Sequence, residues 1–248
     1  MNWDLKDQVV LVTGAGRGLG KAVAELLAQS GARVAVCDID GVTAAETARG
    51  IGAAAKYYAF DVSDRAAFMA AAADFARAHG RIDAVINNAM LLKYEPVENV
   101  SPETLDTMLG VGIKGAIWGA QALLAHMDAS RGGDIVNMAS PVAEKGFPNT
   151  SIYSLVKGAT VTLTKTLSAE LGPRKVRVNA VAPGSVPTPG AMGLNSEEEY
   201  ARRARTIPLR RLGSADDNAQ AVAFLLSPAA SFINGEILHV DGGIAAAG

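Results

Sequence analysis

The sequence predicts an α/β fold in which about seven strands form one doubly wound, parallel sheet with helices on both faces. The first observation is that short apolar runs rich in β-branched residues alternate with longer helical patterns along most of the chain. The second is that most of these runs are apolar at consecutive positions, as in strands that helices cover on both sides. The third is a glycine-rich turn between the first apolar run and the first helical pattern.

Strands are expected at residues 8–14, 32–38, 56–62, 81–88, 133–140, 176–184 and 235–243. Helical patterns lie between them, at residues 18–30, 42–50, 64–79, 101–128, 150–171 and 215–227. Gly31 fits the end of the first helix, and Ser101 and Pro102 fit an N-cap followed by the first helical position of the fourth. The alternation implies right-handed crossovers within a single domain spanning residues 1–248. The one long interruption, residues 184–206, is typical of a lid over a substrate.

The composition indicates a soluble protein with a large core. Of the 248 residues, 49% are apolar and 19% are charged, so disorder is not expected. The net charge of −2 gives no reason to expect a nucleic acid or a membrane as partner. Cys37 is the single cysteine, no apolar run reaches the length of a membrane span, and the first residues lack a signal-peptide pattern. We therefore expect a cytoplasmic protein.

The glycine-rich turn, VTGAGRGLGKA at residues 12–22, follows the first strand and opens the first helix. Glycines at this place let a pyrophosphate approach the backbone, and the positive end of the helix dipole attracts it. The turn matches neither the P-loop pattern nor the common G-x-G-x-x-G fingerprint, and what remains is Thr13-Gly14-x-x-x-Gly18-x-Gly20. The alternative interpretation is a tight turn that binds no ligand.

Two charged residues near this turn bear on the choice of cofactor. Asp38 ends the second strand, where a carboxylate can accept hydrogen bonds from the adenosine ribose and would repel a 2′-phosphate, which favours NAD. Arg17 lies in the turn itself and favours NADP, because an arginine there could bind that phosphate. We give Asp38 more weight, since its position at the strand end makes the more direct contact.

Tyr153 and Lys157 are four positions apart in a helical pattern, so they share one face of the helix. An ammonium beside a phenol favours the phenolate, which would lower the pKa of the tyrosine from about 10 towards neutrality. Such a tyrosine could exchange a proton with a substrate near neutral pH. Taken alone, the pair is as readily interpreted as a surface contact.

Together, these motifs resemble the short-chain dehydrogenases/reductases of the small, single-domain type over nearly the whole chain. The matching segments are Thr13–Gly20, Asp61-Val62, Asn87-Asn88-Ala89, the set Ser140, Tyr153 and Lys157, Pro183–Thr188, and the ending at residues 235–243. The resemblance implies reversible oxidation of an alcohol to a ketone with a nicotinamide cofactor. It makes Tyr153 the general acid or base and lets Ser140 hold the substrate oxygen. Lys157, besides acting on Tyr153, would hydrogen-bond the nicotinamide ribose.

The resemblance also implies which residues contact the cofactor and the substrate. The cofactor set is Gly14, Arg17, Gly18, Leu19, Gly20, Asp38, Asp61, Val62, Asn88, Ala89, Tyr153, Lys157, Pro183, Gly184, Val186 and Thr188. The expected walls of the substrate pocket are Met90, Leu91, Leu92, Tyr94, Pro141, Val142, Phe147, Thr150 and Val186. Most of these walls are apolar, so a hydrophobic ketone or secondary alcohol is expected. The three histidines lack metal-ligand spacing, and no catalytic metal is expected.

The chain departs from the family pattern at two positions. Gly112 stands where the family usually has an asparagine, which belongs to a proton relay that reaches the lysine. Either the relay survives through backbone and water, with an altered pH dependence, or catalysis is impaired; we expect the first, because Ser140, Tyr153 and Lys157 are all present. Met90 stands where the family has a glycine, and it either borders the nicotinamide and the substrate or only fills a gap.

We therefore expect an NAD(H)-dependent oxidoreductase that interconverts a hydrophobic secondary alcohol and its ketone. One alternative is an NADPH-dependent 3-ketoacyl-thioester reductase, which the arginines near residues 202–211 would favour. Against it, Glu198 with Arg202 and Glu199 with Arg203 are spaced to pair along a helix surface. A second alternative is a cofactor-binding scaffold with little turnover. The resemblance further implies a homotetramer built through the fourth and fifth helices and the C-terminal strand.

Overall fold

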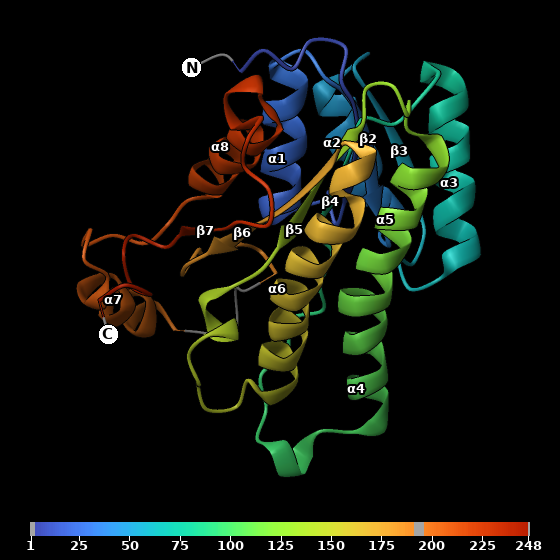
Figure 1. Cartoon of the computed structure of the whole chain (residues 1–248). Coiled ribbons are helices and arrows are strands. Elements are labelled where there is room, and N and C mark those ends of the chain that lie inside the picture. The colour runs from blue at the N-terminus through green and yellow to red at the C-terminus, as the bar shows by residue number, and fades with distance from the viewer. Residues whose placement is uncertain (1–2, 191–195, 248) are drawn as a thin grey trace.

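A computed structural model of the protein describes residues 3–190 and 196–247 (Figure 1). Seven parallel strands form one sheet in the order β3-β2-β1-β4-β5-β6-β7. The strands are β1 Val9–Thr13, β2 Arg33–Asp38, β3 Ala55–Ala59, β4 Ala84–Asn87, β5 Gly133–Met138, β6 Val176–Pro183 and β7 Ile237–Val240. The strand order reverses between β1 and β4, which is where a doubly wound sheet opens a crevice for its ligand. The predicted fold class is confirmed.

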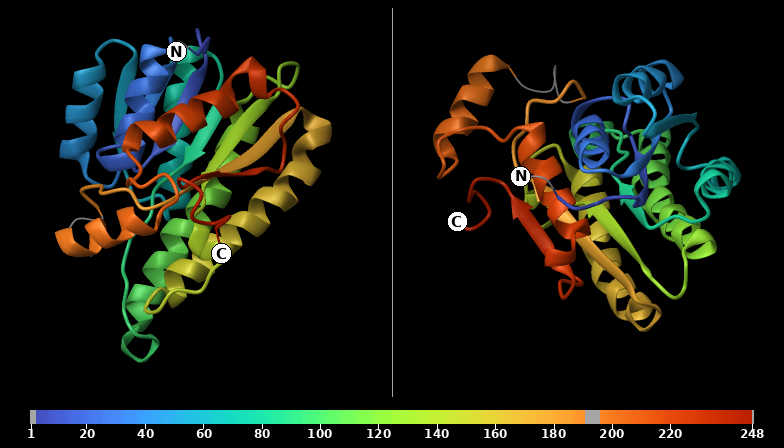
Figure 2. Two further views of the ribbon diagram at one scale, coloured as in Figure 1. Left: turned by 90° about the vertical axis from the view of Figure 1, so that its left-hand side faces the viewer. Right: turned by 90° about the horizontal axis from the view of Figure 1, so that it is seen from above.

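Helices cover both faces of this sheet (Figure 2). One face carries α1 (Gly18–Gln29), α2 (Gly41–Ile51) and α8 (Ala215–Leu226), and the other carries α3 (Arg65–His79), α5 (Gly115–His126) and α6 (Ser151–Leu171). Side chains of β1 alternate between these layers because successive residues of a strand point to opposite faces. Val10 and Val12 pack beside α1 and α8, whereas Val9 and Leu11 pack beside α3 and α5.

The prediction that most strands are buried on both faces holds in the middle of the sheet, and the two edge strands are the exceptions. All five residues of β1 are buried, whereas in β3 Lys56, Tyr57 and Ala59 are exposed. The residues of β7 are only partly buried. Edge strands have a neighbour on one side only, and charged or polar side chains there discourage pairing with another chain.

The helix predicted at residues 101–128 is one helical stretch with a π-helical turn inside it. It consists of α4 (Pro102–Leu109), the π-turn Gly110–Lys114 and α5. Ser101 caps α4 as predicted, because its hydroxyl accepts a 3.1 Å hydrogen bond from the Thr104 N–H. Single π-turns inside α-helices occur frequently at functional sites.

By length and composition, the stretch Pro102–His126 is apolar enough to cross a membrane. The expectation that no segment of this kind occurs is therefore corrected. Within the fold, this helix packs against α3, β4 and α6 and contributes Ala120, Ala122 and Leu123 to the core. These contacts are those of a core helix.

Part of the segment expected to form a lid is helical. α7 (Glu197–Thr206) is capped by Ser196, whose hydroxyl accepts a hydrogen bond from the Glu199 N–H. Residues 184–190 lead away from β6, and residues 191–195 of the expected lid lie outside the described residues. α7 stands apart from the sheet in Figure 1. That residues 184–206 cover a substrate remains a prediction.

Candidate active site

The glycine-rich turn is fastened to the end of β4, its neighbour in the sheet. The Thr13 hydroxyl accepts hydrogen bonds from the N–H groups of Asn88 at 3.0 Å and Ala89 at 3.1 Å. In return, the Asn88 amide donates to the carbonyls of Thr13 at 2.9 Å and Gly14 at 3.0 Å. These bonds fix the glycine turn at the carboxyl edge of the sheet. Asn88 and Ala89, both in the predicted cofactor set, therefore hold the turn in place.

The shape of the turn requires glycine. Gly14 and Gly18 have φ values of 63° and 60°, a conformation that other residues rarely adopt. A Cβ at Gly20 would lie 2.2 Å from the Gly14 carbonyl oxygen. Arg17 precedes α1 but makes no side-chain cap, so the helix N-terminus faces the crevice without a carboxylate or hydroxyl on it. A bare backbone of this kind fits a pyrophosphate, as predicted. Leu19 packs against the core, so only its backbone is available to such a ligand.

Asp38 is held in place at the end of β2 by backbone donors. Its carboxylate accepts hydrogen bonds from the N–H groups of Gly16 at 2.9 Å and Asp40 at 3.1 Å. The first bond ties the carboxylate directly to the glycine turn, at the predicted ribose position. Arg17 is exposed, and its charge helps to lower the pKa of Asp40, after the larger effect of the Thr43 and Val42 N–H groups.

The remaining predicted cofactor residues lie on both sides of the turn. Asp61 accepts a 2.8 Å hydrogen bond from the Ser63 N–H, and Val62 is buried against the backbone of α5. After β6, the Gly184 N–H donates to the Val240 carbonyl at 3.0 Å. A Cβ at Gly18 would lie 3.4 Å from the Thr188 Cβ, so Thr188 stands beside the glycine turn. The fold thus gathers around one crevice segments that are far apart in the sequence.

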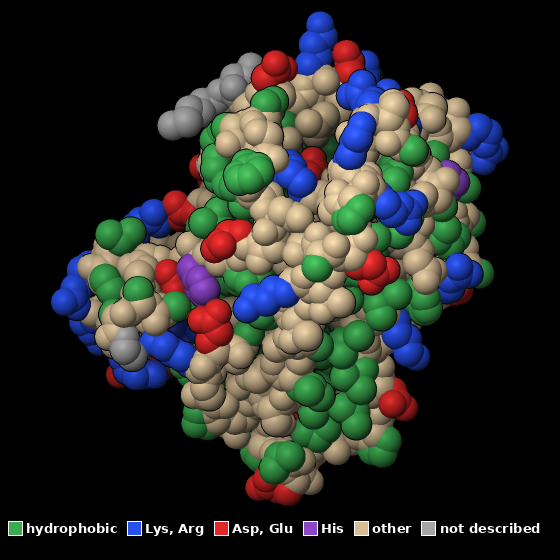
Figure 3. Space-filling view, in the orientation of Figure 1, with side chains coloured by type: hydrophobic (Ala, Val, Ile, Leu, Met, Phe, Trp, Pro, Cys, Tyr) green, Lys and Arg blue, Asp and Glu red, His purple; other side chains and the backbone are tan. Residues whose placement is uncertain are grey.

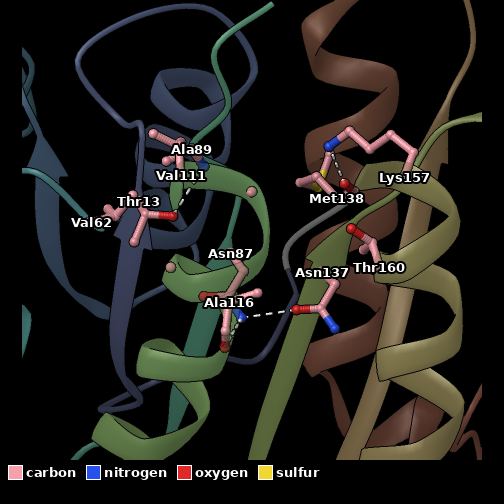
Figure 4. Close-up of a pocket in the computed structure, with 12 residues that line it drawn as sticks. Thr13, Val62, Asn87, Ala89, Val111, Ala116, Asn137, Met138, Lys157 and Thr160 are labelled. Atoms are coloured by element: carbon pink, nitrogen blue, oxygen red, sulfur yellow. Dashed lines mark hydrogen bonds between the residues drawn. The ribbon is translucent and has the colours of Figure 1, made fainter. Parts of the chain in front are cut away.

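The structure brings Ser140, Tyr153 and Lys157 together. Ser140 follows β5 and is 8% exposed, while Tyr153 and Lys157 lie one turn apart on α6. The Nζ of Lys157 donates a 2.6 Å hydrogen bond to the Met138 carbonyl (Figure 4). The same Nζ lies 5.6 Å from the centroid of the Tyr153 ring. The Ser140 hydroxyl is close enough to the phenol to act on its pKa as a hydrogen-bond partner. The three side chains predicted to act together are therefore neighbours in the fold, and their catalytic roles remain a prediction.

The direction of one pKa shift differs from the expectation. Burial is the largest influence on Tyr153 and raises its pKa above the ordinary value of 10; Tyr94 adds to this effect and the Ser140 hydroxyl opposes it. Burial also lowers the pKa of Lys157 to about 8. The expected lowering of the Tyr153 pKa is wrong for this arrangement, because burial of the phenol outweighs the opposing influence of Ser140. Tyr153 is therefore a protonated phenol at neutral pH and suited to donate a proton.

A small polar cavity adjoins Lys157, and the sequence did not predict it. Its volume is about 10 Å³, close to the minimum for one water molecule, and Thr160 and the π-turn help to line it. The side-chain amide of Asn87 donates to the side-chain Oδ1 of Asn137 at 2.8 Å (Figure 4). The Asn137 side-chain amide in turn donates to the Thr164 hydroxyl at 2.9 Å. Asn137 is a buried polar residue that follows the apolar pair Ile135 and Val136 in β5, and this interruption is the signal that could have found it.

The residues predicted to line the substrate pocket divide into two groups. Tyr94 packs its ring edge-on against Tyr153, with the centroids 5.6 Å apart, and Pro141 is buried directly after Ser140. Others make structural contacts: the Thr150 hydroxyl donates to the Phe147 carbonyl at 2.8 Å. Val142 donates its N–H to the Ser140 hydroxyl, and the ring of Phe147 is half exposed. Met90 packs against Gly112, as described below.

The arginines of α7 and the following segment are largely paired with carboxylates. Arg202 and Arg203 both bond to Glu199, at 2.8 and 2.9 Å, and together they lower its pKa to about 2. The predicted pairing of Arg203 with Glu199 is present, whereas Arg202 bonds to Glu199 instead of the predicted Glu198. Arg211 bonds to Asp217 at 2.7 Å. Figure 3 shows basic side chains gathered around α7.

The chain is similar to known proteins over nearly its whole length. A family model described as enoyl-(acyl carrier protein) reductase matches residues 14–245. A curated relative, 2-(S)-hydroxypropyl-CoM dehydrogenase 3 of Xanthobacter autotrophicus, is 36% identical, and the match covers 98% of each protein.

Solved structures agree with this match. The structure of a short-chain dehydrogenase/reductase, described as a glucose/ribitol dehydrogenase, from Brucella melitensis superposes with a TM-score of 0.94 at 30% identity, covering 98% of this chain and 99% of that one. A 3-ketoacyl-(acyl-carrier-protein) reductase from the same organism, complexed with NADH, has a TM-score of 0.92 at 36% identity, covering 97% of this chain and 99% of that one.

Proposed function

The chain belongs to the short-chain dehydrogenase/reductase family of NAD(P)-dependent oxidoreductases, and on this basis we propose that it interconverts a hydrophobic secondary alcohol and its ketone with NAD(H). The observation that carries the proposal is the grouping of Ser140, Tyr153 and Lys157 at the carboxyl edge of β5. The apolar character of the predicted pocket walls supports a hydrophobic substrate.

The chemistry follows from what these three side chains can do. A bound nicotinamide supplies the hydride for the carbonyl carbon, or accepts it in the reverse direction. Ser140 donates a hydrogen bond to the substrate oxygen, and Tyr153 transfers its phenolic proton to that oxygen as negative charge develops there. Lys157, when protonated, stabilises the phenolate that remains. In alcohol oxidation the same phenolate takes the proton back.

The preference for NAD is supported by Asp38. Its carboxylate is fixed by the Gly16 and Asp40 N–H groups, so it cannot easily turn away from a 2′-phosphate. Asp40 adds a second negative charge nearby, and it caps α2 through the Val42 and Thr43 N–H groups. The relative complexed with NADH is a further point of support.

A 3-ketoacyl-thioester reductase is the second candidate, and the similarity to a 3-ketoacyl-(acyl-carrier-protein) reductase favours it. The basic side chains around α7 would suit an acidic carrier or a phosphopantetheine arm. Against this candidate, Arg202, Arg203 and Arg211 already bond to carboxylates of the chain itself. A scaffold with little turnover is the least supported candidate, because the catalytic groups are intact and correctly grouped.

A steady-state assay that follows nicotinamide absorbance separates these candidates. Aryl and cyclic ketones and a 3-ketoacyl thioester are each tested with NADH and with NADPH, with the matching alcohols in reverse. Turnover of the hydrophobic ketones with NADH supports the proposal. Turnover confined to the thioester with NADPH favours the second candidate, and cofactor binding without any turnover favours the scaffold.

The proposal extends to assembly and compartment. Apolar side chains gather over the α4 and α5 region in Figure 3, and Leu155 on α6 is 53% exposed, which supports a homotetramer built through these helices. Cys37 is buried and free, which is compatible with the reducing cytoplasm. Light scattering coupled to gel filtration tests the assembly.

A further inference from the structure

The two positions that depart from the family pattern, Met90 and Gly112, contact one another in the folded chain. A Cβ at position 112 would lie 3.0 Å from the Met90 Sδ and 2.3 Å from the Val156 Cγ1. Favourable contacts between such atoms lie at about 3.5–4.0 Å. The valine therefore leaves no room for a side chain at this position, and the thioether would have to move by a few tenths of an ångström to admit one. Gly112 therefore lets the thioether and the valine reach the backbone of the π-turn.

Close packing at Gly112 gives this glycine a structural cause that Gly50, another helical glycine, lacks. Glycine in a helix interior destabilises the helix relative to alanine, so its presence needs a compensating contact. At Gly50, inside α2, a Cβ would meet nothing within 4 Å. At Gly112 the compensation is close packing of sulfur and methyl groups against main-chain atoms.

The contact joins the cofactor crevice to the catalytic helix. Met90 directly follows Ala89, whose N–H is held by the Thr13 hydroxyl at 3.1 Å. On the other side, Val156 is completely buried and directly precedes Lys157. The π-turn between them also lines the small cavity beside Lys157. The π-turn is therefore packed against the residue that directly precedes the lysine.

We propose that Met90 is a positioning residue for Lys157: its thioether occupies the space that Gly112 leaves and seats the π-turn against Val156. The two departures from the family pattern are then one coupled exchange, and Met90 acts through this packing contact instead of forming a wall of the substrate pocket. The catalytic consequence rests on the proposed function, whereas the packing relationship does not depend on it.

The surroundings of Lys157 make it a suitable reporter of this positioning. The centroid of the Tyr153 ring on the same helix lies 5.6 Å from the Nζ of Lys157, and the Tyr94 ring packs against Tyr153. From β5 it meets the Met138 carbonyl, and from the π-turn it meets the uncharged Val111 and Gly112 across the cavity. A change in the titration of Lys157 therefore reports a change in its packing rather than a new charged neighbour.

The first test is a double-mutant cycle on thermal stability, which needs no substrate. Gly112→Ala, Met90→Gly and the double variant are compared with the original protein, and Gly50→Ala is the control for a helical glycine without neighbours. We expect Gly112→Ala to lower the melting temperature of the original protein. In the Met90→Gly background the π-turn can move away from Val156, so the same substitution should lower the melting temperature much less. Effects that simply add would overturn the proposed coupling.

The second test distinguishes positioning from packing alone. The pH dependence of the melting temperature above pH 8, taken relative to a Lys157→Met variant, reports the titration of the lysine. We expect Met90→Gly to shift this dependence and Met90→Leu, which keeps the volume, to restore it. A melting temperature that falls in Met90→Gly while the pH dependence stays unchanged would show a purely structural role and overturn the proposal.

The third test applies the cycle to turnover. We expect Gly112→Ala to lower kcat/KM by about tenfold with Met90 present and by clearly less with Met90→Gly, and we expect Met90→Leu to stay close to the original value. An equal loss in both backgrounds would contradict the proposal. If the original protein turns over no substrate, the proposed function fails, yet the two thermal tests still decide whether Met90 positions Lys157.

Discussion

The Nζ of Lys157 donates a 2.6 Å hydrogen bond to the main-chain carbonyl of Met138, and this bond ties α6 to the end of β5. The same strand end carries Ser140 two residues later. One strand terminus therefore sets the place of both the lysine and the hydroxyl that act on Tyr153. The relationship explains how groups from two elements keep a fixed geometry before any substrate binds.

The buried lysine predicts a pH dependence of stability. Burial lowers its pKa to about 8 in the folded protein, from 10.5 in the reference state. Between these values the unfolded chain binds a proton that the folded chain does not, so stability should rise with pH from about 8 to 10. Melting temperatures of the original protein and Lys157→Met, measured across this range, check the sign. A difference between them that does not change with pH would contradict the prediction.

The protonation states of Tyr153 and Lys157 predict opposite pH profiles for the two directions of the reaction. Ketone reduction needs a protonated Tyr153 and should fall above about pH 8, as Lys157 loses its charge. Alcohol oxidation needs the phenolate, whose formation burial opposes, so its rate should increase with pH. Measured kcat/KM profiles in both directions check this. Profiles that rise together would contradict the assignment of Tyr153.

Removing the phenolic hydroxyl tests Tyr153 directly. We expect Tyr153→Phe to lower kcat by about 10²-fold or more, because the proton donor is lost, while folding and NADH affinity stay close to the original. Tyr57→Phe is the matched control, since Tyr57 lies on the edge strand β3 and is half exposed. An activity loss of equal size in both variants would point to a general effect of the substitution.

The glycine turn predicts a contrast between two glycine substitutions. Gly20→Ala should destabilise the fold by about 1–3 kcal/mol and abolish dinucleotide binding, because the new Cβ would lie 2.2 Å from the Gly14 carbonyl oxygen. Gly50→Ala should raise stability by up to about 1 kcal/mol, since the helix gains propensity and nothing obstructs the methyl group. Denaturant unfolding and calorimetric NADH titration measure both effects.

Much of the fold could be predicted because its signals are local. The apolar runs identify the strands, Ser101 marks the start of α4, and Gly31 marks the end of α1. The π-turn could not be predicted, since Leu105, Met108 and Ala116 continue an apolar face through it, and the extra residue in the turn follows from packing against neighbours. The exposure of β3 follows from its place at the edge of the sheet, and no single segment of the sequence encodes the strand order.

The site shows the same division. Ser140, Tyr153, Lys157 and the glycine turn have fixed spacings, so they could be identified in advance. The direction of the Tyr153 pKa shift could not, because it depends on burial and on the choice of Met138 as partner for Lys157. The contact between Met90 and Gly112 joins segments 22 positions apart, and only the folded chain reveals it.

Cofactor choice gives the most direct test of the proposed function. We would measure kcat/KM with NADH and with NADPH on a hydrophobic ketone, for the original protein and for Asp38→Ala, with Arg17→Ala as the comparison. We expect the original protein to prefer NADH by at least about tenfold, and we expect Asp38→Ala to reduce or reverse this preference. A preference for NADPH in the original protein that Arg17→Ala abolishes would contradict the proposed function, and would favour the thioester reductase.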